Sequence, residues 1–177
     1  MKIVPERPQD LAAIESLNDA AFGANRNHKT VYRLRDGLAP DAPLCFVALD
    51  EHDVLCASLR FWRIVIGPTK TPALLLGPLA VMPALRGQGY GKALMRHGID
   101  AARRLGHKLI VLVGDPEYYN PFGFTREAAL ALKLPGPVEE RRFLALPLVE
   151  GALAGVGGMI GRGPAGSATS AARRAAR

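Results

Sequence analysis

The feature of this sequence that most restricts its fold is an apolar run, Ala73–Val81, which contains no polar or charged side chain. A run of this kind is typical of a strand buried on both faces of a sheet. Gly89–Leu105 follows with apolar and basic residues on opposite helical faces, and Leu109–Val113 is a second apolar strand. A strand, a helix and a strand within about 40 residues predict a right-handed crossover between parallel strands. We therefore expect an α/β protein.

Weaker patterns extend the sheet on both sides of this unit. The Asp50–Asp53 turn separates two strand-like runs and predicts an antiparallel hairpin. The other expected elements are strands at Met1–Pro5, Leu44–Leu49, Val54–Ile66, Ala128–Leu134 and Arg142–Val149, and helices from Pro8 to Gly23 and over His28–Leu38. A length of 177 residues fits one core. We expect a single domain with a mixed sheet that turns parallel near its centre.

The C-terminal residues differ in composition from the rest of the chain. Gly151–Arg177 is rich in glycine and alanine and has no acidic residue. Four of its residues are arginines, so of the net charge of +7 only +3 remains on residues 1–150. We expect a folded domain over 1–150 and a tail over 151–177, with Gly161–Arg177 disordered. The tail lacks aromatic residues that could stack on bases, so nucleic-acid binding is not favoured.

Nothing in the sequence predicts export or membrane insertion. The N-terminus is charged from Lys2 onward, and the longest uncharged stretch, Thr71–Leu85, is interrupted by several prolines. Cys45 and Cys56 match no metal-binding spacing and are expected to be free, buried thiols. We therefore expect a cytoplasmic protein without a bound metal.

The segment between the apolar strand and its helix is Arg86-Gly87-Gln88-Gly89-Tyr90-Gly91-Lys92. Closely spaced glycines let backbone N–H groups approach a ligand, and a helix start adds unpaired donors and a partial positive charge. A Walker A loop would need a hydroxyl residue where this chain has Ala93. A Rossmann motif would need its third glycine one residue beyond Gly91. The segment therefore predicts a phosphate site of another kind, with a turn that binds nothing as the alternative.

Given these residues, the chain resembles a known superfamily. Arg86-x-x-Gly89-x-Gly91 has the form Q/R-x-x-G-x-G/A, the acetyl-CoA pyrophosphate loop of GNAT N-acetyltransferases. Gly114–Phe124 is similar to the second segment of that superfamily, with Tyr119 four residues before a Gly-Phe pair. The run LGPLAVMPALRGQGYGKALM … VLVGDPEYYNPFGF resembles the YhbS-type branch in particular. Two ordered motifs at this separation are more specific than either alone.

The resemblance implies a GNAT-type fold with a partly splayed central sheet and an acetyl-CoA-dependent N-acetyltransferase acting by direct attack in a ternary complex. Backbone groups of Leu79, Ala80 and Val81 would pair with the pantetheine arm of the cofactor. The pyrophosphate would be held by Arg86, Gly87, Gln88, Gly89, Tyr90, Gly91 and Lys92. Tyr119 would be the general acid that protonates the departing thiolate, and Tyr118 is expected to point to the other side.

Two further points concern the strand and the proton acceptor. Pro78 lacks an N–H and follows a glycine, so we expect a bulge or local splay there. The strand contains no ionisable side chain, and the sequence does not identify a general base. Asp115, Glu117 and His28 are candidates, each with a solvated or capping role as the alternative. A relayed water, or an amine that arrives neutral, would also serve.

The acceptor is an amine, on a small molecule or a protein, that the sequence does not identify. Arg26, Lys29, Arg33 and Arg35 lie in a stretch without carboxylates. If this stretch lines the acceptor site, an acceptor with a carboxylate or phosphate is favoured over a polyamine. The alternative is a solvated helix face. A non-catalytic acyl-CoA-binding module is the competing class of function, and a homodimer is one oligomeric state that the resemblance allows.

Overall fold

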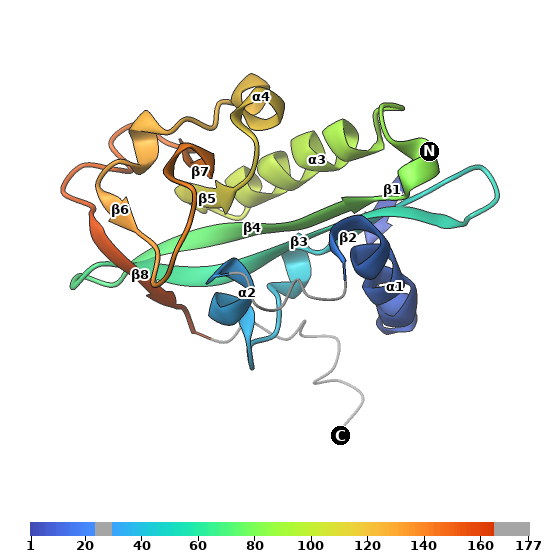
Figure 1. Cartoon of the computed structure of the whole chain (residues 1–177), viewed down its shortest axis with the longest axis horizontal. Coiled ribbons are helices and arrows are strands. Elements are labelled where there is room, and N and C mark those ends of the chain that lie inside the picture. Colours follow the sequence, from blue (N-terminus) through green and yellow to red (C-terminus); the bar gives the residue numbers. More distant parts are fainter. Residues whose placement is uncertain (24–29, 165–177) are drawn as a thin grey trace.

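The computed structural model describes residues 1–23 and 30–164, which form a mixed β-sheet with helices on both faces (Figure 1). The strands are β1 (Lys2–Pro5), β2 (Phe46–Leu49), β3 (Leu55–Ile66), β4 (Thr71–Val81), β5 (Leu109–Val113), β6 (Leu132–Lys133), β7 (Phe143–Pro147) and β8 (Gly158–Arg162). Their main spatial order is β1-β2-β3-β4-β5-β7. β1 to β4 are antiparallel neighbours, whereas β4 and β5 are parallel. The expected mixed sheet with a parallel crossover is confirmed.

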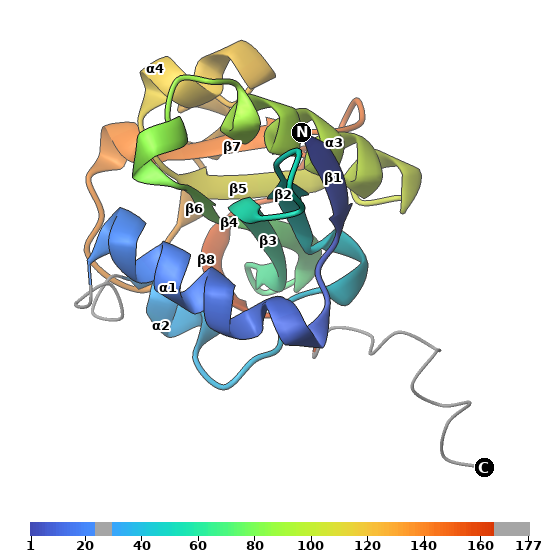
Figure 2. The same ribbon diagram turned by 90° about the vertical axis from the view of Figure 1, so that its right-hand side faces the viewer.

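The helices are α1 (Leu11–Phe22), α2 (Thr30–Arg35), α3 (Tyr90–Arg104) and α4 (Pro116–Tyr119). α3 covers one face of the sheet, and α1 and α2 lie on the opposite face (Figure 1 and Figure 2). On the α3 side, Leu94 and Ile99 share a core with Phe61 of β3. Gly98 allows this contact, because a Cβ there would lie 2.8 Å from the Phe61 ring. On the other face, Leu34 of α2 packs in a core with the apolar residues of β3, β4 and β5.

β4 and β5 separate toward their carboxyl ends. Their pairing ends at Leu75 and Val111. Just beyond, β4 carries an extra residue relative to β3 at the Gly77-Pro78 step, which is the bulge expected from the sequence. From Leu76 to Val81, β4 is paired with β3, and no strand of residues 1–23 and 30–164 pairs with its other edge. The partly splayed sheet is thereby confirmed.

The segment Ala128–Leu134 does not form the single strand that its apolar residues predict. Glu127–Ala129 is a 3-10 turn in which the N–H of Ala128 donates to the Thr125 hydroxyl at 3.2 Å. Only Leu132–Lys133 is extended, and it pairs with β8. A hydroxyl that accepts a hydrogen bond from the local backbone competes with the strand ladder, which explains the shortened strand.

The expected domain boundary at residue 150 is corrected by β8, which lies inside the expected tail. β8 pairs with Ile64–Ile66 of β3, beyond the part of β3 that β2 covers, and the Ile160 side chain is buried. The glycine just after β8 lets the two backbones approach closely, because a Cβ on Gly163 would lie 2.6 Å from the β3 backbone. Residues 165–177, which the sequence assigns to a disordered tail, lie outside the described residues.

Candidate active site

The glycine loop leads from β4 into α3 through left-handed backbone positions. Gly87 and Gly89 have φ angles of 80° and 90°, which residues with a side chain rarely adopt. α3 begins at Tyr90, and no side chain caps its N-terminus. The first N–H groups of a helix have no partner within it and carry the positive end of its dipole. The loop therefore directs several donors and a partial positive charge into the space beside it.

A cavity of about 530 Å³ occupies that space, and we call it the loop cavity. It is lined by Arg86, Gly87, Gly89, Tyr90, Gly91 and Lys92, together with Ala21, Phe22, Leu79, Val81, Leu85, Asp115, Tyr118 and Tyr119. Two residues expected to bind the cofactor do not line it. The side chain of Ala80 is buried on the opposite face of β4 from Leu79 and Val81. The Gln88 amide donates to the carbonyl oxygen of Ala84 at 3.2 Å.

A second cavity, of about 470 Å³, fills the opening between β4 and β5, and we call it the split cavity. Leu76–Leu79 of β4 line one side, and Leu112–Gly114 at the end of β5 line the other. Tyr119 and Leu79 line both this cavity and the loop cavity, so the two adjoin at these side chains. The described residues thus line two adjoining cavities, one beside the glycine loop and one in the opening of the sheet.

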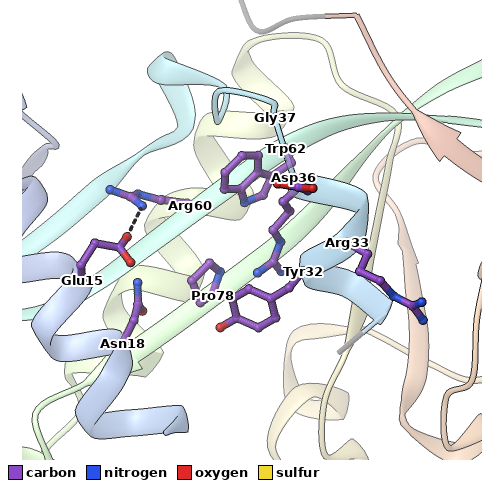
Figure 3. A pocket seen from close by; sticks show the side chains of 10 residues that line it. Glu15, Asn18, Tyr32, Arg33, Asp36, Gly37, Arg60, Trp62 and Pro78 are labelled. Atoms are coloured by element: carbon purple, nitrogen blue, oxygen red, sulfur yellow. Dashed lines mark hydrogen bonds and ion pairs between the residues drawn. The ribbon is translucent and has the colours of Figure 1, made fainter. Parts of the chain in front are cut away.

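A third cavity, of about 430 Å³, lies on the face of the sheet that α1 and α2 cover (Figure 3). This outer cavity is lined by Glu15, Asn18, Tyr32, Arg33, Arg35, Asp36, Gly37, Arg60, Trp62 and Pro78. It shares Tyr32, Arg35 and Pro78 with the split cavity. Figure 3 shows Tyr32, Trp62 and Pro78 close together at its centre, with Arg33 directed away from them.

Tyr119 stands where the loop and split cavities meet. Its ring lies directly over Gly114, where any side chain would collide with it, and it packs edge-to-face on Tyr118 with 4.9 Å between ring centres. Its hydroxyl makes no hydrogen bond to any residue of 1–23 or 30–164. Burial raises the pKa of Tyr119 above its ordinary value. The phenol is therefore protonated at neutral pH and available to a ligand.

The expectation that Tyr118 points away from the site needs correction. Both tyrosines line the loop cavity, and only Tyr119 also reaches the split cavity. The Tyr118 hydroxyl lies over the first turn of α3, 2.6 Å from where a Cβ on Gly91 would be. Gly91 thus provides the space for this hydroxyl beside the glycine loop. The short helix α4 lets two successive side chains face the same cavity, which strand-like alternation would not allow.

Arg35 is the most unusual charged residue of the site. Only 8% of it is exposed, and its Nε and Nη1 atoms are buried without a hydrogen-bond partner. Its guanidinium lies 4.9 Å from the Tyr32 ring centre and 5.8 Å from that of Trp62. Burial lowers the pKa of Arg35 to about 10, so the group is still charged at neutral pH. Arg60, by contrast, is paired with Glu6 at 2.8 Å and with Glu15 at 3.2 Å.

The three candidates for the general base fall in different places. Asp115 lines the loop and split cavities, and its carboxylate lies 3.1 Å from the Arg142 guanidinium. Glu117 is exposed and pairs with Arg141 at 3.4 Å, away from the cavities. His28, Arg26 and Lys29 lie outside the described residues.

Sequence reasoning did not single out the outer cavity. Its residues come from α1, α2, β3 and β4, so no local spacing connects them. One signal was present in β3, where Ser58, Arg60 and Trp62 alternate with apolar residues although the strand is central in the sheet. Such alternation marks one polar face of a buried strand.

Several expectations about the rest of the chain can be compared with the structure. Cys45 and Cys56 are free and buried, as expected, and burial raises the pKa of Cys45 to about 12. Within residues 1–23 and 30–164, no three metal-ligating side chains come together. None of the helices in these same ranges combines the length and the apolar character needed to cross a membrane.

The segment from α1 to the tyrosine motif identifies the class of protein. Residues 11–124 match the acetyltransferase (GNAT) family, and the chain belongs to that family. The superfamily suggested by the two motifs is therefore confirmed.

Individual relatives agree with this assignment. The uncharacterised N-acetyltransferase YhbS of Escherichia coli (strain K12) is 31% identical over 161 residues, which cover 90% of this chain and 95% of YhbS. The crystal structure of E. coli YhbS in complex with CoA has a TM-score of 0.78 at 29% identity, covering 92% of this chain and 89% of YhbS. A GNAT family acetyltransferase from Brucella melitensis in complex with acetyl-CoA has a TM-score of 0.65 at 27% identity, covering 94% and 92%.

Proposed function

We propose that this chain is an acetyl-CoA-dependent N-acetyltransferase whose acceptor amine reacts in the split between β4 and β5. The observation that carries the proposal is the position of Tyr119, which lines the loop cavity and the split cavity where β4 loses β5 as a neighbour. Two relatives of known structure are complexes with CoA and with acetyl-CoA. Family membership supports acyl transfer, and the cavities of this chain suggest where each substrate lies.

In this proposal the loop cavity holds the nucleotide end of the cofactor. The N–H groups of Gly87–Lys92 and the charge of Arg86 would face the pyrophosphate, because phosphate favours a helix N-terminus and a positive side chain. The free edge of Leu79–Val81 would pair with the amides of the pantetheine arm like an added strand. Ala80 and Gln88 would contribute only through their backbones, since their side chains are engaged elsewhere.

The transfer step then takes place beside Tyr119. The neutral amine nitrogen attacks the thioester carbonyl carbon, forms the C–N bond and gives a tetrahedral intermediate. The C–S bond breaks, and the sulfur leaves with the electron pair of that bond. The Tyr119 hydroxyl donates a proton to the sulfur, while the amide nitrogen loses one proton to water, which restores the phenol. The products are an N-acetylated amine and the CoA thiol.

A non-catalytic acyl-CoA-binding module is the competing function. It would use the loop cavity alone and would leave the split and outer cavities without a role. The Tyr119 hydroxyl lies where the loop and split cavities meet and makes no hydrogen bond to the described residues, which favours the enzyme. The acceptor, whether a small molecule or a protein, and the homodimer suggested by the resemblance stay predictions.

Calorimetric titration with acetyl-CoA, with free CoA and ATP as controls, tests the proposed cofactor. We expect micromolar binding of both CoA species and much weaker binding of ATP, because only the CoA species can pair with the edge of β4. A protein that bound none of the three would contradict the proposal, and so would one that bound ATP as tightly as acetyl-CoA. Release of free thiol from acetyl-CoA in the presence of an amine would then separate the enzyme from the binding module.

A further inference from the structure

We propose that Arg35 determines acceptor specificity by binding a carboxylate of the amine substrate. The inference rests on the proposed function and deepens it by naming a substrate class: amines that also carry a carboxylate, such as α-amino acids. The supporting observations are the burial of Arg35, its unused donors and its place between two cavities.

The first observation is that Arg35 is buried without an ion-pair partner among the described residues. Two of its nitrogen atoms have no hydrogen-bond partner, and no carboxylate of the described residues forms an ion pair with it. Burial has the largest effect on the pKa of Arg35. The ionisable groups with the next largest effects are Tyr32, Arg60 and Tyr119, and none of them is a carboxylic acid. Burying an unpaired charge is costly, and a buried donor normally has a partner. A ligand anion would supply both the missing charge and the missing acceptors.

The second observation is the position of the guanidinium. Arg35 lines both the split cavity and the outer cavity, at the boundary between them. Its Nη2 atom lies 3.0 Å from where a Cβ on Gly77 would be, so the guanidinium is set against the bulge of β4. A carboxylate held there would place a nearby amine close to the end of the split where Tyr119 lies.

The third observation is that the guanidinium lies against two aromatic rings rather than against a carboxylate. The Tyr32 and Trp62 ring centres lie 4.9 and 5.8 Å from it, which holds the side chain while its Nε and Nη1 atoms have no hydrogen-bond partner. A planar guanidinium binds a carboxylate through two parallel hydrogen bonds, which a lysine cannot do. Arg60 in the same cavity has no such capacity, because Glu6 and Glu15 already occupy it.

A carboxylate could also arrive at the end of the acyl group, as in succinyl-CoA. We assign it to the acceptor because Arg35 also lines the outer cavity, which shares no lining residue with the loop cavity that would hold the cofactor. The test therefore compares acetyl-CoA with succinyl-CoA as donors.

Trp62 is the only tryptophan of the chain and lies beside Arg35, so its fluorescence reports on this site. The protein saturated with CoA is titrated with each protein amino acid and with its amide, which has the same side chain and amine but no carboxylate. We expect some of the acids to change Trp62 emission in the CoA complex. With acetyl-CoA as the donor, we expect the same acids to be acetylated with kcat/KM about 100-fold higher than for their amides, as for the loss of a charge-assisted hydrogen-bonded pair.

Arg35→Gln should remove this preference, and Arg35→Lys should restore little of it, because lysine lacks the planar fork. Arg104→Gln, at an exposed position near the end of α3, is the matched control and should behave as the wild type. Acetyl-CoA affinity measured for each variant shows that the loop cavity is intact. If Arg35→Gln does not fold, the comparison of acids with amides on the wild type decides the matter.

The outcomes separate the two proposals. Failure to bind acetyl-CoA would contradict the proposed function. Normal acetyl-CoA binding with equal use of acids and amides, or with no acid that is acetylated or changes Trp62 emission, would overturn the role of Arg35 alone. Efficient use of succinyl-CoA that depends on Arg35 would also overturn it, because the carboxylate would then belong to the donor.

Discussion

The indole N–H of Trp62 donates a hydrogen bond of 2.7 Å to the carbonyl oxygen of Gly77. A side chain of β3 thus fixes the bulge that separates β4 from β5. The same ring lies beside the Arg35 guanidinium. Trp62 therefore contacts both the bulge in β4 and the charge set against it.

Replacing Trp62 with Phe should keep an aromatic ring and lose this hydrogen bond. The carbonyl of the buried Gly77 would be left without its partner, so we expect the free energy of unfolding to fall by about 1–3 kcal/mol. Urea denaturation followed by circular dichroism measures the change. An unaltered midpoint and slope would show that the bulge does not need the indole.

Arg86→Ala should mainly weaken acetyl-CoA binding. Arg86 lines the loop cavity, and its removal takes a full charge from the expected pyrophosphate site. We expect a rise in the acetyl-CoA dissociation constant of about 10-fold, with kcat at saturation little changed. Calorimetry at two salt concentrations checks this, because the difference between wild type and variant should shrink as salt rises. Equal affinities at low salt would remove Arg86 from the binding site.

Tyr119→Phe should lower kcat and leave acetyl-CoA affinity nearly intact. The ring would still pack on Tyr118 and Phe124, while the hydroxyl proposed to donate the proton at the junction would be lost. A loss of about 100-fold in kcat fits the removal of a general acid. Stopped-flow measurement of thiol release gives kcat, and calorimetry gives the affinity. A variant with unchanged turnover would show that the proton comes from elsewhere.

The pH profile should carry no sign of tyrosine ionisation in the ordinary range. Burial raises the pKa of Tyr119, so the protonated, donating form persists to higher pH than for a free phenol, which ionises near pH 10. We therefore expect kcat to rise with pH as the amine deprotonates and to show no fall up to about pH 9.5. A fall below that pH that disappears in Tyr119→Phe would mean that the phenol has a lowered pKa.

Two neighbours in β8 test whether the C-terminal strand belongs to the fold. Ile160 is 1% exposed and Met159 is 52% exposed. Ile160→Ala should cost about 2–5 kcal/mol of stability, the usual range for a buried isoleucine, and Met159→Ala less than about 1 kcal/mol. Thermal or urea unfolding of both variants makes the comparison. Equal small effects would place β8 outside the cooperative unit.

The parts of the site that could be predicted from sequence are those whose residues are close together in the chain. The glycine loop and Tyr119 belong to continuous motifs, and the bulge follows from the missing N–H of Pro78. The fold around them could be expected because Ala73–Val81 and Leu109–Val113 are apolar throughout.

The outer cavity could not be predicted in the same way, because tertiary structure alone brings Arg35 of α2 beside Trp62 of β3. Arg35 was one of several basic residues in its stretch, and only its burial distinguishes it. β8 was missed for a different reason: the glycine- and alanine-rich composition of Gly151–Arg177 suggests a tail, although Gly163, just after β8, lets the backbone approach β3.

The Arg162 side chain of β8 donates a hydrogen bond of 3.0 Å to the carbonyl oxygen of Arg33 in α2. Because of this contact, the residues of the loop cavity and the full set of contacts of α2 are completed at different times during synthesis on the ribosome. The residues that line the loop cavity have all been translated once Tyr119 is added, whereas α2 receives this anchor only after Arg162. A nascent chain halted between these two points would contain every residue that lines the loop cavity while α2 still lacked its contact with β8.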